Sequence, residues 1–144
     1  MPTTTPKVDP AFTLATHVVN TGLADLPAQT LSATRRDVLD TFGAMLGGSG
    51  APGIKELVAV TGHWGGLEEA TLAVLGQKMP AHHTALVNSA MGHALDFDDT
   101  YDKGGHVHPG TSVLAASLAV GESLGGVTGA QLIVAVTLGL DVSC

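Results

Sequence analysis

The sequence predicts an all-α fold, a helical bundle, on the basis of three observations. Over most of the chain, apolar residues recur three and four positions apart, which places them on one face of a helix. Prolines, glycines and capping residues stand where these apolar stretches begin and end. Only residues 70–75 are short and apolar enough to form a strand or an extended connector. The 144 residues are otherwise sufficient for one domain with its own core.

Two helices are expected in the first third of the chain. Residues 1–10 are rich in threonine and proline and are expected to be a disordered tail. A first helix follows and ends near Gly22; its apolar face is formed by Phe12, Ala15, Val18 and Val19. A second helix follows the cap and proline of Asp25-Leu26-Pro27 and ends at Gly47-Gly48. Its apolar stripe comprises Leu31, Val38, Leu39, Phe42, Met45 and Leu46.

The middle of the chain adds three more predicted helices. Pro52 opens one, which ends in the glycine-rich turn at residues 62–66. The next runs from Ala81 to about Phe97, with paired apolar positions four apart, and carries a group of aspartates at its C-terminal end. Pro109 stands in the first turn of the third, which is apolar on almost every side, as expected of a helix in the centre of a bundle.

The last predicted helix begins at a capping box, Thr128-Gly129-Ala130-Gln131, in which the threonine and glutamine side chains bond each other's backbone amides. An apolar run, residues 132–140, follows it. No glycine or asparagine cap, basic last turn or proline comes before Cys144. We therefore expect residues 11–144 to be an incomplete helical domain, the N-terminal part of a longer protein.

Composition argues against several classes of partner. The net charge is −7, and the six lysines and arginines cluster only at Arg35-Arg36, so neither nucleic acid nor an anionic membrane is expected. The apolar runs are too short to span a membrane. A single cysteine and the absence of a signal-peptide pattern favour a reducing cytoplasm. The low charge also predicts apolar helix faces that need to be covered.

Residues with chemical potential are concentrated in residues 93–110, which hold four aspartates and three histidines. Asp96 and Thr100 are four apart, and His93 precedes Asp96 by three, so the three side chains share a helix face if the helix continues that far. The negative end of the helix dipole would then favour a protonated carboxylate, which suits proton transfer near neutral pH. Alternatively, Asp98 and Asp99 only bond backbone amides in the following turn.

His108 lies where the helix opened by Pro109 begins. Free backbone amides and the positive end of the helix dipole at such a position attract a carboxylate-bearing substrate. Because histidine exchanges protons at physiological pH, His108 is a candidate acid–base residue, and the alternative is that it only caps the helix. His106 is a second candidate. The remaining histidines have no acidic neighbour in sequence and are expected at the surface or in the core; they are His17, His63, His82 and His83.

The pattern His-Ala-Leu-Asp-Phe-Asp-Asp-Thr at residues 93–100, followed by a polar loop and His108-Pro109-Gly110, resembles the MmgE/PrpD family. Residues 36–43 and 85–90 resemble the family more loosely. Its members include 2-methylcitrate dehydratases, cis-aconitate decarboxylases and an iminodisuccinate epimerase. The resemblance implies a longer, homodimeric protein in which an α/β domain follows the helical one.

The resemblance also implies roles for individual residues. Asp96, Thr100 and His108 are expected in the substrate pocket as catalytic residues. Lys103, His106 and His93 are expected to help bind the substrate, and Lys103 is the only cation near the motif, although polycarboxylates usually need cations to bind. The loop between motif and His-Pro differs from that of several relatives, so His106 stays open as the alternative to His108. No metal or other cofactor is expected.

The reaction implied is removal of a proton beside a carboxylate, by a carbon–oxygen lyase that needs only an acid–base pair. Dehydration of a 2-methylcitrate-like hydroxy polycarboxylate is the first expectation, and epimerisation or decarboxylation of a related acid is the alternative. We expect this activity of the full-length protein. Residues 1–144 alone are expected to be inactive, and they then serve as a folding or oligomerisation unit.

Two metal-dependent alternatives remain open. Residues 98–102 spell Asp-Asp-x-x-Asp, the pattern by which all-helical isoprenoid synthases hold magnesium and a diphosphate, but the arginines expected to grip a diphosphate are missing. His106 and His108, with an aspartate, form a possible His-x-His metal site. Adding metal to a metal-stripped sample separates both from the leading hypothesis, which predicts no effect.

Overall fold

The computed structural model describes residues 9–144, so most of the expected N-terminal tail, residues 1–8, lies outside the described residues. Six α-helices make up most of this part: α1 (Pro10–Asn20), α2 (Ala28–Gly48), α3 (Ile54–Trp64), α4 (Ala81–His93), α5 (Pro109–Ser123) and α6 (Gly129–Ser143). A 3-10 turn, η1 (Leu23–Asp25), and two short antiparallel strands, β1 (Ala70–Thr71) and β2 (Lys78–Met79), complete it. The predicted all-α helical fold is confirmed.

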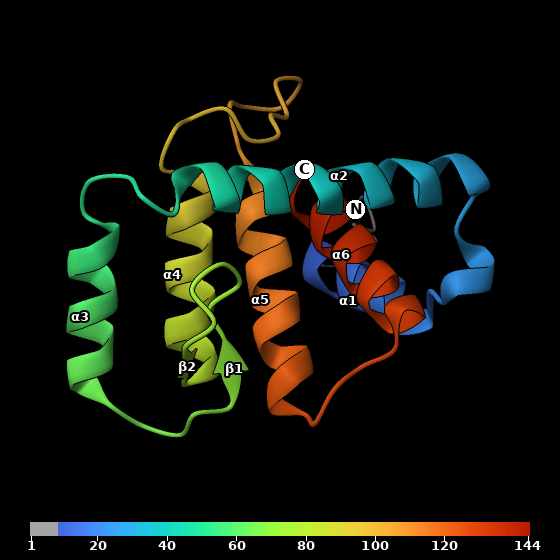
Figure 1. Cartoon of the computed structure of the whole chain (residues 1–144). Helices are drawn as coiled ribbons and strands as arrows, with labels where there is room; N and C mark the ends of the chain where they lie inside the picture. The colour runs from blue at the N-terminus through green and yellow to red at the C-terminus, as the bar shows by residue number, and fades with distance from the viewer. Residues whose placement is uncertain (1–8) are drawn as a thin grey trace, which may run out of the picture.

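Helices α4 and α5 lie side by side in the centre, and α2 crosses one end of both (Figure 1). Helix α6 packs against α5 and α2, while α3 packs against α4. Helices α2 and α4 cross so closely that a side-chain carbon on Gly48 would overlap the carbonyl group of Met91. The core between these helices contains Met45, Val87, Met91, Leu114 and Val136. The loop that joins α4 to α5 therefore emerges at the end of the bundle that α2 covers.

Several apolar helix faces are exposed, as the low charge led us to expect. On α1, which we predicted to have an inner face, Phe12 is 70% exposed and Val19 78% exposed. On α2 only Met45 of the predicted stripe is fully buried, and Leu39 is 74% exposed. Within residues 9–144, even so, no helix is both long enough and apolar enough to cross a membrane.

Several helix starts differ from the predictions by a few residues. Helix α1 begins within the expected tail, at Pro10, because the Asp9 carboxylate accepts a hydrogen bond from the Ala11 amide (2.9 Å). Pro27 is the N-cap of α2 and not part of its first turn. Helix α3 begins two residues after Pro52, because Gly53 has a left-handed conformation with φ 91°.

Asp25 was predicted to cap α2, but in the structure it does not. Its carboxylate accepts a hydrogen bond from the Gly22 amide (2.8 Å) and so stabilises η1. Residues 70–75 were expected to form either a strand or an extended connector. In the structure the first two residues form β1, and the others turn back toward β2. The strand β2 was not predicted.

The predicted extension of α4 to Phe97 is wrong, because the helix ends at His93. The Asp96 amide closes a turn on the His93 carbonyl (3.1 Å), and Asp96 has the left-handed φ of 55°. On a continuous helix, Asp98 would point about 140° away from His93 around the axis. In the structure its carboxylate lies against the His93 ring instead. The tertiary contact of Asp98 thus replaces another helical turn.

Candidate functional site

The candidate site lies at the base of the loop between α4 and α5, which extends past α2 in Figure 1. Two backbone hydrogen bonds connect the two sides of this loop. One runs from the Tyr101 amide to the Val107 carbonyl (2.9 Å), and the other from the Val107 amide to the Tyr101 carbonyl (3.3 Å). They divide the loop into a base, beside the helix ends, and a tip, residues 102–106. The base carries most of the predicted site residues.

At the centre of the base, the Asp98 carboxylate is completely buried between two imidazoles. Both of its oxygens lie 3.1 Å from Nδ1 of His93, and Oδ1 lies 3.5 Å from Nδ1 of His108. The two rings are close to each other, with centroids 4.8 Å apart. Asp98 therefore orients a histidine from the end of α4 and another from the start of α5.

Asp96 is the exposed carboxylate on the other side of His108. Its Oδ1 lies 3.8 Å from Nε2 of His108, and its side chain is 79% exposed, whereas that of His108 is 26% exposed. One donor atom from each of four side chains falls within 4.8 Å of the others. We call these four residues, His93, Asp96, Asp98 and His108, the His–Asp cluster.

Asp99 binds the start of α5. The Gly110 amide donates to both carboxylate oxygens, each at 3.0 Å. A side-chain carbon on Gly110 would come within 2.5 Å of Asp99 Oδ1 and 3.1 Å of Thr41 Oγ1, so the absence of one lets the carboxylate approach. Asp99 thus bonds a backbone amide, as the alternative predicted, but at the start of α5 and not in the following turn; for Asp98 the alternative is wrong. The Gly110 amide, where we expected a substrate carboxylate, is bonded to the chain's own acid.

Helix α2 brings a second acid to this region. Burial raises the pKa of Asp37 to about 6, helped by repulsion from Asp99 and Asp40, and its Oδ2 is buried without a hydrogen-bond partner. Burial also raises the pKa of Asp99, and the Gly110 hydrogen bond partly offsets that rise. In residues 9–144 every ion pair joins a histidine to an aspartate, so no lysine or arginine pairs with these acids.

The structure brings together three of the six predicted site residues, namely His93, Asp96 and His108. The shared helix face proposed for Asp96 and Thr100 is wrong, because the helix has ended; the Thr100 hydroxyl donates to the Asp98 carbonyl (3.4 Å) and supports the loop. Lys103 and His106 are exposed on the loop tip and lie outside the cluster.

From the sequence, Asp98 and Asp99 were assigned either to backbone bonds or to the Asp-Asp-x-x-Asp magnesium pattern, and Asp37 was assigned no role. The relevant signal for Asp98 was its spacing from His93. The two residues are five positions apart, which places them on different faces of a helix but lets them meet if the helix stops at His93.

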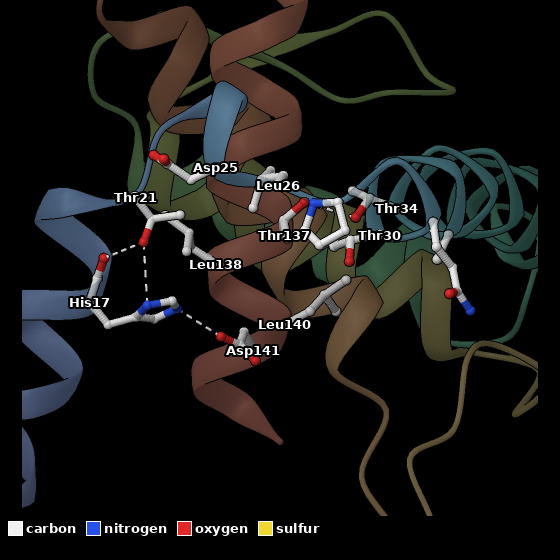
Figure 2. Close-up of a pocket in the computed structure, with 13 residues that line it drawn as sticks. His17, Thr21, Asp25, Leu26, Thr30, Thr34, Thr137, Leu138, Leu140 and Asp141 are labelled. Atoms are coloured by element: carbon white, nitrogen blue, oxygen red, sulfur yellow. Dashed lines mark hydrogen bonds and ion pairs between the residues drawn. The ribbon is translucent and has the colours of Figure 1, made fainter.

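A cavity of about 630 Å³ lies away from the His–Asp cluster, between α1, η1, α2 and α6 (Figure 2). His17 Nε2 lies 2.8 Å from Asp141 Oδ2 at its edge, and the hydroxyls of Thr34 and Thr137 are 2.8 Å apart and buried. None of the predicted site residues lines this cavity. His17, which has no acidic neighbour in sequence, thus has an acidic partner from the far end of the chain.

His83 is the most buried of the remaining histidines. Its ring centroid lies 5.4 Å from that of Trp64 and 4.1 Å from that of His82, and its Nδ1 is buried without a partner. The expected position in the core is therefore confirmed, although its polar atom is not satisfied.

Comparison with known proteins points to one family. A sequence profile of the MmgE/PrpD N-terminal domain matches residues 13–144. The human (Homo sapiens) cis-aconitate decarboxylase is 27% identical over 144 residues, an alignment that covers 94% of this chain and 28% of the human protein. The chain thus spans less than a third of the length of this relative.

Proposed function

This chain belongs to the MmgE/PrpD family, and from that premise we propose that it carries the acid–base groups of a metal-independent carbon–oxygen lyase. The observation that carries the proposal is the position of His108. Its ring lies between the buried Asp98 carboxylate and the exposed Asp96 carboxylate, with nitrogen–oxygen distances of 3.5 and 3.8 Å. A histidine that faces a buried acid on one side and solvent on the other is suited to move a proton.

In this proposal, Asp98 is the positioning residue. Its carboxylate faces Nδ1 of His108 and favours the tautomer with the proton on that nitrogen, so that the lone pair of Nε2 is free on the exposed side. The 3.5 Å separation is longer than a good hydrogen bond, and such catalytic contacts commonly shorten when the substrate binds. His93, whose Nδ1 lies 3.1 Å from both oxygens of Asp98, holds the carboxylate in place.

The reaction we propose is dehydration of a 2-methylcitrate-like hydroxy polycarboxylate. Nε2 of His108 removes the proton beside a carboxylate, the electron pair forms a carbon–carbon double bond, and Asp96 in its protonated form gives its proton to the departing hydroxyl, which leaves as water. Thr100, Lys103 and His106 are assigned to substrate binding, with the two loop-tip residues closing over the bound acid.

Two other outcomes use the same acid–base pair. In decarboxylation, the reaction named for the human relative, a carbon–carbon bond breaks, carbon dioxide leaves and the carbon takes a proton. In epimerisation, the proton removed by one group is replaced on the opposite face by the other. The product distinguishes the three outcomes.

Magnesium-dependent diphosphate chemistry receives no support from the geometry. Asp98 is buried against two histidines, Asp99 binds the Gly110 amide, and Asp102 is on the exposed loop tip. The three acids of the Asp-Asp-x-x-Asp pattern therefore do not face one shared ion, as that chemistry requires.

Proton NMR in heavy water tests the proposal. The intact protein, stripped of metal, is incubated with 2-methylcitrate, citrate, cis-aconitate and iminodisuccinate. We expect deuterium uptake or a new product, reduced by about 10²- to 10⁴-fold in Asp96→Asn and His108→Gln. Asp102→Asn, at an exposed acid of the loop tip, is the matched control and keeps wild-type activity. Full activity in both test variants would refute the assignment.

We propose further that the intact protein is a cytoplasmic homodimer and that residues 1–144 alone do not turn over substrate. Sedimentation equilibrium of the intact protein tests the dimer, and cell fractionation tests its compartment. Measurable turnover by the 144-residue chain would show that its own groups suffice.

A further inference from the structure

We propose that the His–Asp cluster also binds a divalent transition-metal ion such as Zn²⁺, and that the ion inhibits the enzyme by competing with the substrate. The second half of this proposal rests on the proposed function, whereas metal binding does not.

The donor atoms are already near the spacing of a metal site. Zinc bound by nitrogen and oxygen at about 2.0–2.2 Å places neighbouring ligand atoms about 3.4 Å apart in a tetrahedron. Nδ1 of His93 and Nδ1 of His108 lie 3.1 and 3.5 Å from Oδ1 of Asp98, whereas the exposed Asp96 carboxylate lies 3.8 Å from the other ring nitrogen of His108, Nε2, and has to turn toward the ion. One donor atom from each residue lies within 4.8 Å of the other three. Small side-chain rotations therefore bring four ligands around one ion.

A buried atom without a partner supports the same site. Nδ1 of His108 is buried and makes no hydrogen bond, although it faces the fully buried carboxylate of Asp98. Burying a polar atom without a partner costs free energy, and an ion between this ring and the carboxylate would satisfy both groups.

The donor set selects the class of ion. Two imidazoles and two carboxylates suit Zn²⁺, Co²⁺ or Ni²⁺, because Mg²⁺ and Ca²⁺ prefer oxygen ligands alone. The charges agree, since two carboxylates neutralise one divalent ion. No lysine or arginine in residues 9–144 forms an ion pair with the cluster, so its negative charge is not already balanced by a cationic side chain.

Competition follows from shared atoms. The proposed reaction needs a lone pair on Nε2 of His108 and a proton on the Asp96 carboxyl group. An ion bound to Nδ1 of His108 leaves the ring proton on Nε2, and an ion bound to Asp96 takes the place of its proton, so neither group can act. A substrate with several carboxylates can also displace or recruit the ion. If the substrate has to displace the ion, added metal increases the apparent KM and leaves kcat unchanged. This result distinguishes displacement of the ion from its recruitment by the substrate.

Metal binding is tested first, without substrate. Co²⁺ is titrated into the metal-stripped chain and followed by its visible absorption, and Zn²⁺ binding is followed by calorimetry. We expect one ion per chain. His93→Gln and Asp98→Asn should each weaken binding about tenfold or more. His93 is exposed, so its variant is expected to fold, and circular dichroism checks both proteins.

Two loop-tip variants serve as controls. Asp102→Asn and His106→Gln should keep wild-type metal affinity, because neither residue belongs to the cluster. Weaker binding in His106→Gln with no change in His93→Gln would overturn the assignment in favour of a His-x-His site. Unchanged binding in both His93→Gln and Asp98→Asn would also overturn it.

Inhibition is tested on the intact enzyme with the substrate that the NMR panel identifies. Zn²⁺ should raise the apparent KM and leave kcat unchanged, and a chelator should reverse the effect. Activation by Zn²⁺, or no effect at saturating metal, would overturn the inhibitory role. Absence of turnover with every substrate would refute the proposed function, whereas the cobalt titration would still decide by itself whether the cluster binds metal.

Discussion

Helices α5 and α6 each contain 15 residues and pack against each other, yet their N-termini are stabilised in different ways. At α6, Thr128 and Gln131 bond each other's backbone amides at 3.2 and 2.8 Å. At α5, the N-cap residue His108 makes no capping bond, and Asp99 supplies the acceptor from the preceding loop. A local cap stabilises one helix, whereas a distant cap also fixes the loop that carries the His–Asp cluster.

The caps of α5 and α6 also differ in charge. The α6 cap uses neutral groups at the surface, but the α5 cap uses a carboxylate whose pKa burial raises. After burial, repulsion from Asp98 contributes to the raised pKa of Asp99, and repulsion from Asp99 contributes to the raised pKa of Asp37. This electrostatic cost falls at the end of the bundle where the candidate chemistry lies, and not at the neutral cap that begins α6.

The largest expected effect is that of Gly110→Ala. The added carbon would lie 2.5 Å from Asp99 Oδ1, so either the carboxylate or the helix must move, and we expect a loss of about 2–3 kcal/mol in the free energy of unfolding. Gly129→Ala, in the first turn of α6, meets no atom within 4 Å and should change stability by about 0.5 kcal/mol or less. Urea unfolding followed by circular dichroism measures both. Equal effects would mean that the close approach at α5 is unimportant.

Asp99→Ala should have the next largest effect. It leaves the Gly110 amide without its acceptor, and we expect a loss of about 1.5 kcal/mol at pH 7, since relief of acid–acid repulsion offsets part of the lost hydrogen bonding. Because Asp99 also fixes the loop, the variant should lose amide hydrogen-exchange protection at Gly110. An unchanged exchange rate there would show that the cap does not order the start of α5.

Thr128→Ala should cost about 1 kcal/mol, the usual effect of removing a threonine N-cap. Its consequences should be confined to α6, because the cap bonds only residues of its own first turn. Two-dimensional NMR should show shifted amides at the start of α6 and unshifted histidine ring signals in the His–Asp cluster. Shifts of the cluster rings would mean that the two helix starts are coupled.

The smallest effect concerns the pH dependence of Asp37. Its pKa is raised from 3.8 to about 6 in the folded chain, so the folded state holds this proton more tightly than the unfolded state does. The contribution of Asp37 to stability is therefore greatest below pH 3.8 and falls as pH rises toward about 6.

Asp37→Asn removes this titration. It should raise stability by about 0.5 kcal/mol at pH 7, a small value because Asp37 is only half-buried and solvent screens its charge. Unfolding curves between pH 4 and 7 should show a smaller loss of stability with rising pH than in the parent chain. The control Asp102→Asn, at an exposed acid, should follow the parent; a matching change there would remove Asp37 as the cause.

The comparison of helix starts also explains which parts could be predicted from the sequence. The Thr128 cap and the first-turn position of Pro109 are local patterns, and both were predicted correctly. The end of α4 was not, because the apolar pattern continues to Leu95 while the buried contact of Asp98 with His93 decides where the helix stops. A side-chain contact made in the turn after a helix leaves no trace in the apolar periodicity.

The same reasoning applies to the site. The motif predicted that His93, Asp96 and His108 belong together, and the structure brings them together, although as a loop and two helix ends and not as one helix face. Lys103 and His106 are close to the motif in sequence, but the backbone bonds between Tyr101 and Val107 hold them on the tip. Nearness along the chain could not reveal that division.

The paired backbone hydrogen bonds between Tyr101 and Val107 separate the five-residue tip from the base of the loop. Because its two ends are joined by paired backbone bonds, residues can be inserted or removed within it while the ends keep their separation. A longer or shorter tip would therefore alter which molecules can approach the exposed side of the His–Asp cluster, and it would leave the buried carboxylate and its two imidazoles in place. Exchanging this tip between relatives offers a way to change substrate choice separately from chemistry.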